Sequence, residues 1–176
     1  MNNPVLLENL RCIPDFPKKG INFRDVTTLY KNPECMKIMV DEMYELYKDK
    51  GITKIVGIES RGFVMAAALA TKLGAGVVLA RKPGKLPATV IKESFSKEYG
   101  VDTVEMHIDS IDENDVVLIH DDLLATGGTA KATLKIVNHF HPKKVYMNFI
   151  IEITDEGLHG RDCLEKDVEV TTLMVI

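Results

Sequence analysis

The chain has 176 residues and a mass of 19.6 kDa, with 45% hydrophobic and 27% charged residues. This length and mixture predict one globular domain over residues 1–176, and they exclude a disordered chain. Lys and Arg number 22 and Asp and Glu 26, so the net charge is -4. That balance argues against a general nucleic-acid binder, although a local basic cluster could still bind small phosphates.

Targeting and redox features are sparse. The longest apolar run, Phe63 to Ala70, is much shorter than the about 20 residues that a membrane-spanning helix needs, so no membrane partner is expected. Residues 1–10 lack the basic and long apolar regions of a secretory signal. The three cysteines are widely spaced without a CxxC pair, which predicts reduced thiols and a cytoplasmic location.

The first clear elements are a helix and a strand. A helix is expected over 33–49, because Asn32 can cap it, Pro33 suits its first turn, and apolar residues recur at spacings of three and four. Gly51 is expected to close this helix. The short apolar run over 54–58 then predicts a buried strand.

A second helix and strand follow. Residues 63–73 are apolar almost all round, which predicts a buried helix that Gly74 ends. Residues 76–80 form the next predicted strand. The segment 81–87 cannot be helical, because two prolines and a glycine interrupt it.

The second half of the chain repeats this alternation. Apolar and polar residues alternate over 104–108, as in a half-exposed strand. Further strands are predicted over 116–120, 144–152 and 168–175, and a helix over 130–140. The order predicts an α/β fold, with a mostly parallel central sheet flanked by helices. Ligands of such sheets bind at the carboxyl ends of the strands.

The strongest functional signal is the run 121–129, predicted as a loop after the strand at 116–120. Its second part, 126–129, combines two glycines and two hydroxyls at the start of a helix. Backbone N–H groups and the helix dipole can bind a phosphate there. Because no Lys or Arg lies in 121–130, the backbone would supply the binding.

The acidic pair Asp121 and Asp122 opens the same run. Carboxylates accept hydrogen bonds, so the pair suits the hydroxyls of a ribose or a hydrated magnesium ion. Acceptors for a diol beside donors for a phosphate predict a ribose 5-phosphate site. The alternative for the pair alone is a helix start at which acidic residues favour the dipole.

Basic residues follow two of the predicted strands. Arg61 comes after 54–58, and Arg81, Lys82 and Lys85 come after 76–80. In a chain of negative net charge, their gathering at one sheet edge predicts a polyanion site. The alternative for any one of them is a solvated surface charge.

Residues 116–130 (VVLIHDDLLATGGTA) resemble the phosphoribosyl-diphosphate signature of the type I phosphoribosyltransferases. Four further segments resemble the adenine phosphoribosyltransferases, in the same order: PDFPKKGINFRDVT, GIESRGF, RKPGKLP and EYG. The resemblance implies the fold of that family with a mobile lid loop. It also implies purine salvage: the 5-phosphoribosyl group of 5-phosphoribosyl 1-diphosphate (PRPP) passes to adenine, giving AMP and diphosphate, with Mg²⁺.

The resemblance also implies the site residues. Those that bind PRPP are Ser60, Arg61, Arg81, Lys82, Lys85, Tyr99, Asp121, Asp122, Ala125, Thr126, Gly127, Gly128 and Thr129. Those that bind adenine are Asn22, Phe23, Arg24 and Ile153, with Phe23 stacking on the base and the Arg24 backbone reading its edge. The implied catalytic residues are Glu98, Arg61 and Lys85, and Glu98 would handle a purine proton.

The resemblance extends to the organisation of the chain. Residues 1–30 would form the base-pocket segment and 87–103 the lid, and the Glu59–Ser60 peptide would be cis. Mg²⁺ would be held mainly by PRPP and water, with no direct protein ligand. The implied assembly is a homodimer, in which the neighbouring subunit supplies part of the basic set.

Two residues depart from the family pattern. Asn22 stands where an aliphatic residue is common, so a different purine remains an alternative substrate. His120 stands where valine or isoleucine is usual, and it could either titrate near neutrality or simply pack at the end of a strand. Two functions outside this enzyme class also stay open: a PRPP sensor that controls transcription, and a receiver domain phosphorylated on an aspartate.

Overall fold

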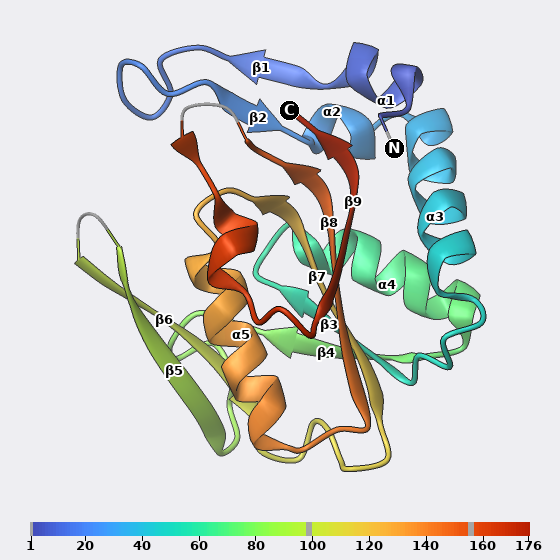
Figure 1. Ribbon diagram of the computed structural model, residues 1–176, viewed down its shortest axis with the longest axis vertical. Helices are drawn as coiled ribbons and strands as arrows, with labels where there is room; N and C mark the ends of the chain where they lie inside the picture. The colour runs from blue at the N-terminus through green and yellow to red at the C-terminus, as the bar shows by residue number, and fades with distance from the viewer. Residues whose placement is uncertain (1, 98–99, 155–156) are drawn as a thin grey trace.

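The computed structural model of the protein describes residues 2–97, 100–154 and 157–176. Its centre is a parallel sheet in the strand order β4-β3-β7-β8-β9 (Figure 1). Two antiparallel ribbons, β1–β2 and β5–β6, lie outside it. The strands are Arg11–Ile13 (β1), Phe23–Asp25 (β2), Lys54–Ile58 (β3), Gly76–Ala80 (β4), Val90–Lys97 (β5), Gly100–His107 (β6), Val116–Leu124 (β7), Lys144–Glu152 (β8) and Glu169–Val175 (β9).

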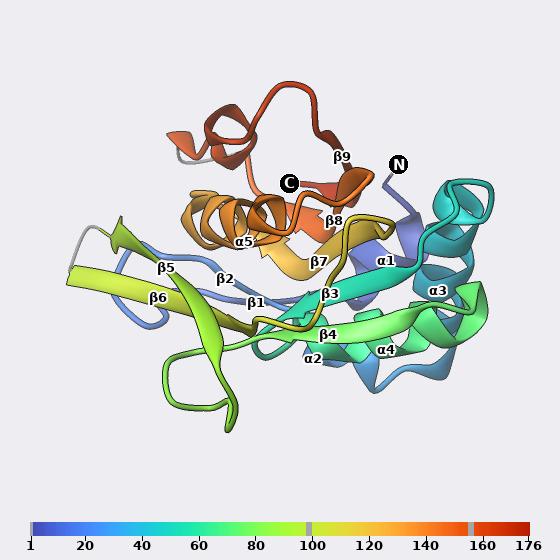
Figure 2. The same cartoon turned by 90° about the horizontal axis from the view of Figure 1, so that it is seen from below.

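Helices cover both faces of the central sheet, which confirms the predicted fold class. Figure 2 shows α5 on one side of the sheet and α3 and α4 on the other. The helices are Pro4–Asn9 (α1), Thr27–Tyr30 (α2), Pro33–Tyr47 (α3), Gly62–Leu73 (α4) and Gly128–His139 (α5), with a 3₁₀ turn over Gly160–Cys163 (η2).

Strand β7 lies in the middle of the sheet and is buried on both faces. Val117 and Ile119 pack with Ile136 on the α5 side, whereas Leu118 packs with Met39 on the side of α3 and α4. A strand covered on both faces needs apolar residues at successive positions, which explains its continuous apolar run. The carboxyl end of this strand is therefore held in place by hydrophobic cores on both faces of the sheet.

The predicted helix boundaries hold with small shifts. The Asn32 side chain accepts the N–H of Glu34 at 2.9 Å, as expected of a cap, and α3 ends at Tyr47 rather than at residue 49. Gly51, with φ of +65°, lies in the following turn. Gly74 ends α4 in the left-handed conformation, as predicted.

The acidic pair lies in a strand, which corrects the prediction of a loop over 121–129. Strand β7 continues to Leu124, because its pairing with β8 extends through Asp121 opposite Phe149 and Leu124 opposite Glu152. The helix that follows begins at Gly128 rather than at residue 130. Asp121 and Asp122 are consequently held by a central strand and point to opposite faces of it.

The segment 87–103 is largely an antiparallel ribbon rather than an irregular loop. Strand β5 was not predicted, and it pairs with β6 along its whole length. The strand predicted over 104–108 is confirmed for 104–107, and Val104 and Met106 are buried as expected. The predicted alternation fails at two positions: Glu105 is buried, and Ile108, beyond the end of β6, is 54% exposed. Glu105 is buried because its carboxylate accepts the N–H of Gly84 and its backbone pairs with Arg81.

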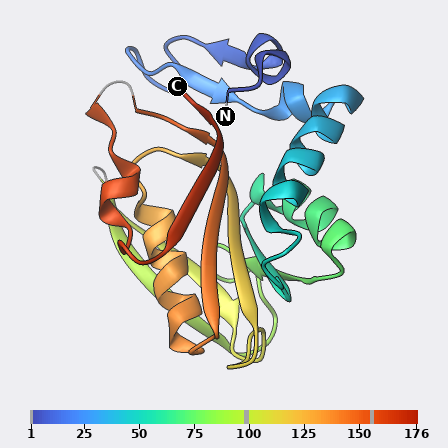
Figure 3. The same ribbon diagram turned by 45° about the vertical axis from the view of Figure 1, so that its right-hand side comes forward.

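The N-terminal ribbon β1–β2 crosses over the end of the sheet at which β8 and β9 finish (Figures 1 and 3). It follows α1, whose Leu6 is fully buried in the core shared with α3. The cysteines are free thiols, as predicted. No helix in the described ranges is long and apolar enough to cross a membrane.

Candidate active site

Two cavities at the carboxyl edge of the sheet share Asp121 and Thr129. The first has a volume of about 200 Å³ and the second about 100 Å³. The first is lined by Ile58, Glu59, Ala80, Arg81, Lys82, Asp102, Thr103, Val104, Asp121 and Thr129. The second is lined by Asp121 and residues 123–130. The structure thus brings together Asp121, the glycine-rich loop and two members of the basic set, Arg81 and Lys82, whereas Asp122 is not among the lining residues of either cavity.

The loop Ala125–Gly127 joins β7 to α5, and we call residues 125–129 the phosphate loop. Gly127 has φ of +77° and stands at the N-cap of α5, so the first N–H groups of this 12-residue helix are not used within it. A Cβ added to Gly128 would lie 2.9 Å from the ring of Phe95. Gly128 is therefore required by the β5–β6 ribbon, in addition to any phosphate.

The acidic pair is electrostatically uneven. Asp122 is 3% exposed, and its Oδ2 lies 2.6 Å from Nε of Arg61. Burial and the charge of Asp122 raise the pKa of Asp121 well above its ordinary value. The Oδ1 atom of Asp121 accepts the backbone N–H of Asp122 at 2.9 Å. Asp121 thus lines both cavities with a raised pKa. A cation or a hydroxyl donor bound beside it would favour its ionised form.

Glu59 lies between β3 and β4, and the sequence patterns did not assign it to the site. Its carboxylate accepts Nε of Arg81 at 3.1 Å and the N–H of Lys82 at 2.9 Å. Burial opposes its ionisation, but these donors outweigh burial and lower the pKa of Glu59. Its place directly after a buried strand is the signal that could have identified it.

The remaining basic residues surround the first cavity differently. Lys82 lines this cavity. Lys85 and Ser60 are exposed and are not among its described lining residues. The Lys85 carbonyl accepts Nη1 of Arg81 at 3.1 Å, which helps to fix that guanidinium. The Glu59–Ser60 peptide is cis, as the resemblance implied.

The predicted base-stacking residue Phe23 is half-buried on β2. Its ring meets Phe16 edge-to-face with 5.3 Å between centroids, and the Arg61 guanidinium lies 5.3 Å from the ring centre. The side chain of Arg24 donates from Nη1 to Cys12 Sγ at 2.6 Å, and Asn22 is exposed. Arg61 therefore joins the predicted base side to the acidic pair.

Ile153 follows β8 directly and is 9% exposed. Its N–H donates to the carbonyl of Leu124 at 2.9 Å, so it lies beside the end of β7 where the phosphate loop begins. The ribbon that carries Phe23 crosses over this end of the sheet (Figure 3). The predicted residues Glu98 and Tyr99 lie outside the described residues.

His120 is fully buried in β7, and its Nδ1 lies 3.0 Å from Oδ1 of Asn148. Burial lowers its pKa from 6.5 to about 4. The possibility that His120 titrates near neutrality is therefore wrong, and it packs as a neutral group within the strand. Sequence alone did not reveal its partner, because Asn148 lies on the next strand.

Asp102 and Thr103 on β6 line the first cavity and were not identified from the sequence. They carry no motif, and the pairing of Glu105 on the same strand with Arg81 helps to hold β6 beside the cavity. No described residues form a group of three or more His, Cys, Asp or Glu side chains that could hold a metal ion.

Comparison with known proteins decides the family. A sequence model of the phosphoribosyl transferase domain matches residues 25–167. An adenine phosphoribosyltransferase of Phocaeicola vulgatus is 60% identical over 176 residues, which is 100% of both chains. The chain belongs to the adenine phosphoribosyltransferase family.

Solved structures of the family have the same fold. The adenine phosphoribosyltransferase of Rhodothermus marinus is 46% identical, with a TM-score of 0.92 over 98% of this chain and 97% of that one. The Saccharomyces cerevisiae enzyme, complexed with an imino-altritol bisphosphate and adenine, is 36% identical, with a TM-score of 0.88 and 97% of each chain covered. The type I phosphoribosyltransferase fold expected from the sequence is thereby confirmed.

Proposed function

We infer that the chain transfers the 5-phosphoribosyl group of PRPP to adenine, which yields AMP and diphosphate in purine salvage. The observation that carries this inference is the continuity of Asp121, Asp122 and the phosphate loop along one strand and into one helix. In a member of this family, that arrangement supports a site in which the carboxylates would accept from a ribose diol and the adjoining backbone N–H groups would donate to its 5-phosphate.

The 5-phosphate and the ribose hydroxyls would then be bound by different kinds of protein group. The N–H groups of Thr126 to Thr129 would bind the 5-phosphate, since they stand at the positive end of α5. Asp121 and Asp122 would accept hydrogen bonds from the ribose hydroxyls. Like charges exclude the opposite arrangement, because a phosphate beside two carboxylates is repelled.

The diphosphate would occupy the first cavity. Arg81 and Lys82 line it, Ser60 and Arg61 follow the lining residue Glu59 in the chain, and the Lys85 carbonyl accepts Nη1 of Arg81. Diphosphate departure from C1 leaves an oxocarbenium-like sugar, and these cations would stabilise the leaving anion. Arg61 and Lys85 are therefore proposed as catalytic residues in addition to their role in binding.

Magnesium fits this site as an ion that accompanies the substrate. Asp121 offers a carboxylate at the junction of the two cavities, but the described residues provide no complete set of ligands. An ion with one protein carboxylate nearby and phosphate and water as its other ligands is typical of Mg²⁺. When bound, it would neutralise charge on the diphosphate.

Adenine would bind between Phe23 and Ile153. Phe23 offers a half-buried aromatic face for stacking, and the backbone of Arg24 would read the edge of the base. Asn22 would lie at the rim of this pocket. Glu98, outside the described residues, is proposed to move a purine proton as the new C–N bond forms.

The segment 87–103 is proposed as a lid that excludes water, which would otherwise hydrolyse the activated sugar. Phe95 on β5 already contacts the phosphate loop at Gly128, and Lys135 on α5 pairs with Glu93 at 2.6 Å. These contacts place one side of the ribbon against the helix that would bind phosphate. Glu98 and Tyr99 belong to the same segment.

A homodimer is proposed through the face formed by α4 and the edge strand β4. Val64, Val77 and Leu79 are each 40% or 41% exposed there, and Val77 and Leu79 lie on the α4 side of the strand. A second copy on this face would lie near Arg81, which follows the same strand. Val77→Lys should then give a monomer in light scattering, whereas Val101→Lys, at a 72% exposed position on β6, should not.

A reducing, cytoplasmic setting remains a prediction. Three free thiols support this prediction: Cys12, Cys35 and Cys163. Cys12 is exposed, so it could form a disulfide with another molecule under oxidising conditions.

The deciding experiment measures diphosphate release from PRPP with adenine, hypoxanthine or guanine, with and without Mg²⁺. Reaction with adenine alone supports the proposal and makes Asn22 a tolerated variation. Reaction with another base would retain the sugar site and require a different base pocket around Asn22 and Phe23. PRPP binding without any transfer would favour the sensor function, and absence of both would overturn the proposed function.

A further inference from the structure

The turn η2 packs directly against the back of the phosphate loop, although about 30 residues separate them in the chain. A Cβ on Gly127 would overlap Sγ of Cys163 and the carbonyl of Gly160. Conversely, a Cβ on Gly160 would overlap the carbonyl of Ala125 and come within 3.0 Å of the nitrogen of Gly127. Two backbone segments therefore touch at a point where neither has room for a side chain.

The thiol of Cys163 completes this contact. Its Sγ lies 3.0 Å from the carbonyl oxygen of Gly160 and 3.5 Å from that of Thr126, so one S–H donor is shared between η2 and the phosphate loop. Burial raises the pKa of Cys163, which keeps the sulfur protonated and able to donate.

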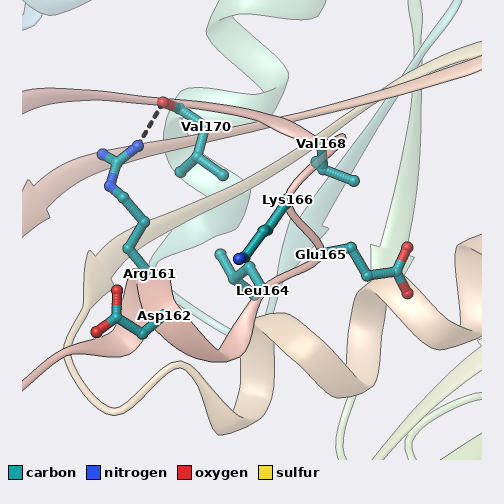
Figure 4. Close-up of a pocket in the computed structure, with 7 residues that line it drawn as sticks. All are labelled: Arg161, Asp162, Leu164, Glu165, Lys166, Val168 and Val170. Carbon is teal, nitrogen blue, oxygen red and sulfur yellow. Dashed lines mark hydrogen bonds between the residues drawn. The ribbon is translucent and has the colours of Figure 1, made fainter.

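The turn itself is fixed to the sheet on both sides of this contact. Arg161 forms an ion pair with Glu152 on β8, with Nε 2.8 Å from Oε1, and its Nη1 donates to the Val170 carbonyl at 2.8 Å. Figure 4 shows the Arg161 side chain extended towards that carbonyl. Leu164 is 7% exposed and belongs to the core beneath α5. The sulfur is therefore held by a rigid support rather than by a free loop.

We propose that Gly160 and Cys163 are positioning residues that set the backbone orientation of the phosphate loop for binding of the PRPP 5-phosphate. This inference rests on the proposed function. The Thr126 carbonyl and the Gly127 N–H belong to one planar trans peptide and point in opposite directions. Holding the carbonyl at Cys163 turns that N–H away from η2, towards the side on which the phosphate binds.

The test is the dissociation constant of PRPP, measured by calorimetry without adenine, for the wild-type chain, Cys163→Ala and Cys163→Ser. Loss of the donor in Cys163→Ala should weaken PRPP binding by about three- to tenfold, the range expected for one hydrogen bond. Cys163→Ser keeps an O–H donor and should remain within about twofold of wild type. The KM for adenine should not change, because the hydrogen bonds of the Cys163 sulfur go to Thr126 and Gly160 and not to the residues proposed to bind adenine.

A matched control separates positioning from simple destabilisation. Cys35 is a fully buried cysteine on α3, away from the loop, and Cys35→Ala should lower the unfolding temperature without changing PRPP affinity. Gly160→Ala provides a second variant, expected to weaken PRPP binding by roughly tenfold or more if it folds, because its Cβ overlaps backbone.

The outcomes distinguish this inference from the function on which it rests. PRPP binding by wild type together with unchanged affinity in Cys163→Ala would overturn the positioning role alone. Weakened binding in both Cys163→Ala and Cys35→Ala, in proportion to lost stability, would overturn it as well. No PRPP binding by the wild-type chain would instead overturn the proposed function.

Discussion

Arg61 and Asp122 are joined by an ion pair with 2.6 Å between Nε and Oδ2, although they are proposed to bind different parts of the same substrate, the diphosphate and the ribose. Arg61 also lies over the ring of Phe23, and its carbonyl accepts the hydroxyl of Tyr30 at 3.0 Å. Without substrate, the cation proposed for the diphosphate therefore neutralises the carboxylate proposed for the ribose. Binding of PRPP would exchange this contact for one between Arg61 and the diphosphate and one between Asp122 and a ribose hydroxyl.

The exchange predicts the effect of Asp122→Asn. A hydrogen bond to a charged acceptor contributes about 1.5–3 kcal/mol, so kcat/KM for PRPP should fall by about 10- to 150-fold. The KM for adenine should remain close to that of wild type. Asp109→Asn, at an exposed loop position, is the control and should be neutral. Steady-state kinetics with PRPP varied would check this, and unchanged kcat/KM would remove Asp122 from the sugar site.

The burial of His120 predicts that the free energy of unfolding decreases in acid. Its pKa falls from 6.5 in the unfolded chain to about 4 in the fold, so between these values the unfolded chain binds more protons. Stability that is fully present above pH 6.5 is therefore lost as the pH falls towards 4. From about pH 7.5 to about pH 4.5, this should cost about 2–3 kcal/mol of unfolding free energy.

Urea unfolding of wild type and His120→Val over this pH range measures that loss. The variant removes the His120 partner of Asn148 Oδ1, although Asn148 Nδ2 still donates to Thr171 Oγ1. It should be less stable at neutral pH, but its stability should fall less steeply in acid. Parallel curves for the two proteins would show that His120 does not titrate as its burial requires.

The sequence predicted the elements that carry their own local signals. Asn32 caps α3 and Gly74 ends α4. The run from Asp121 to Thr129 predicts a phosphate and diol site from local sequence alone, and this assignment remains a prediction. The pairing of Arg61 with Asp122 could not be predicted. It depends on β3 lying parallel to β7 in the register that sets Gly57 opposite His120.

The missed features share this dependence on tertiary contacts. Strand β5 has an irregular mixture of polar and apolar residues, and it forms because it pairs with β6 and packs Phe95 on α5. The contact of Gly160 and Cys163 with the phosphate loop leaves no periodic or compositional trace. In the sequence, a glycine in this loop indicates a phosphate-binding site, whether the space beside its Cα is filled by ligand or by protein.

The close approach of α4 to β7 predicts that Gly62 tolerates no side chain. A Cβ there would lie 2.7 Å from the carbonyl oxygen of His120 and 3.0 Å from Oδ1 of Asp121. Because backbone must shift, Gly62→Ala should cost about 1–3 kcal/mol of stability and also lower kcat/KM for PRPP. Gly76→Ala is the matched control, since its Cβ would meet the flexible side chain of Lys54 at 3.3 Å and the Thr53 carbonyl oxygen at 3.8 Å, an ordinary van der Waals distance.

Thermal unfolding and PRPP kinetics of the two alanine variants decide this prediction. Gly76→Ala should behave like wild type in both measurements. Equal behaviour of Gly62→Ala would mean that Asp121 can move without loss of function, and that its placement by α4 is not required.

The contact of Phe95 with Gly128 predicts a coupling between the lid and the phosphate loop. Gly128→Ala introduces a Cβ that would lie 2.9 Å from the Phe95 ring, so either the ribbon or the loop must move. If the ring is the obstacle, Phe95→Ala should restore much of the PRPP affinity that Gly128→Ala loses. If the phosphate itself fills the space, the second substitution should restore nothing. A double-mutant cycle on the dissociation constant of PRPP separates these cases: the two residues in contact should be coupled by about 0.5–3 kcal/mol, whereas additive losses would assign Gly128 to the phosphate alone.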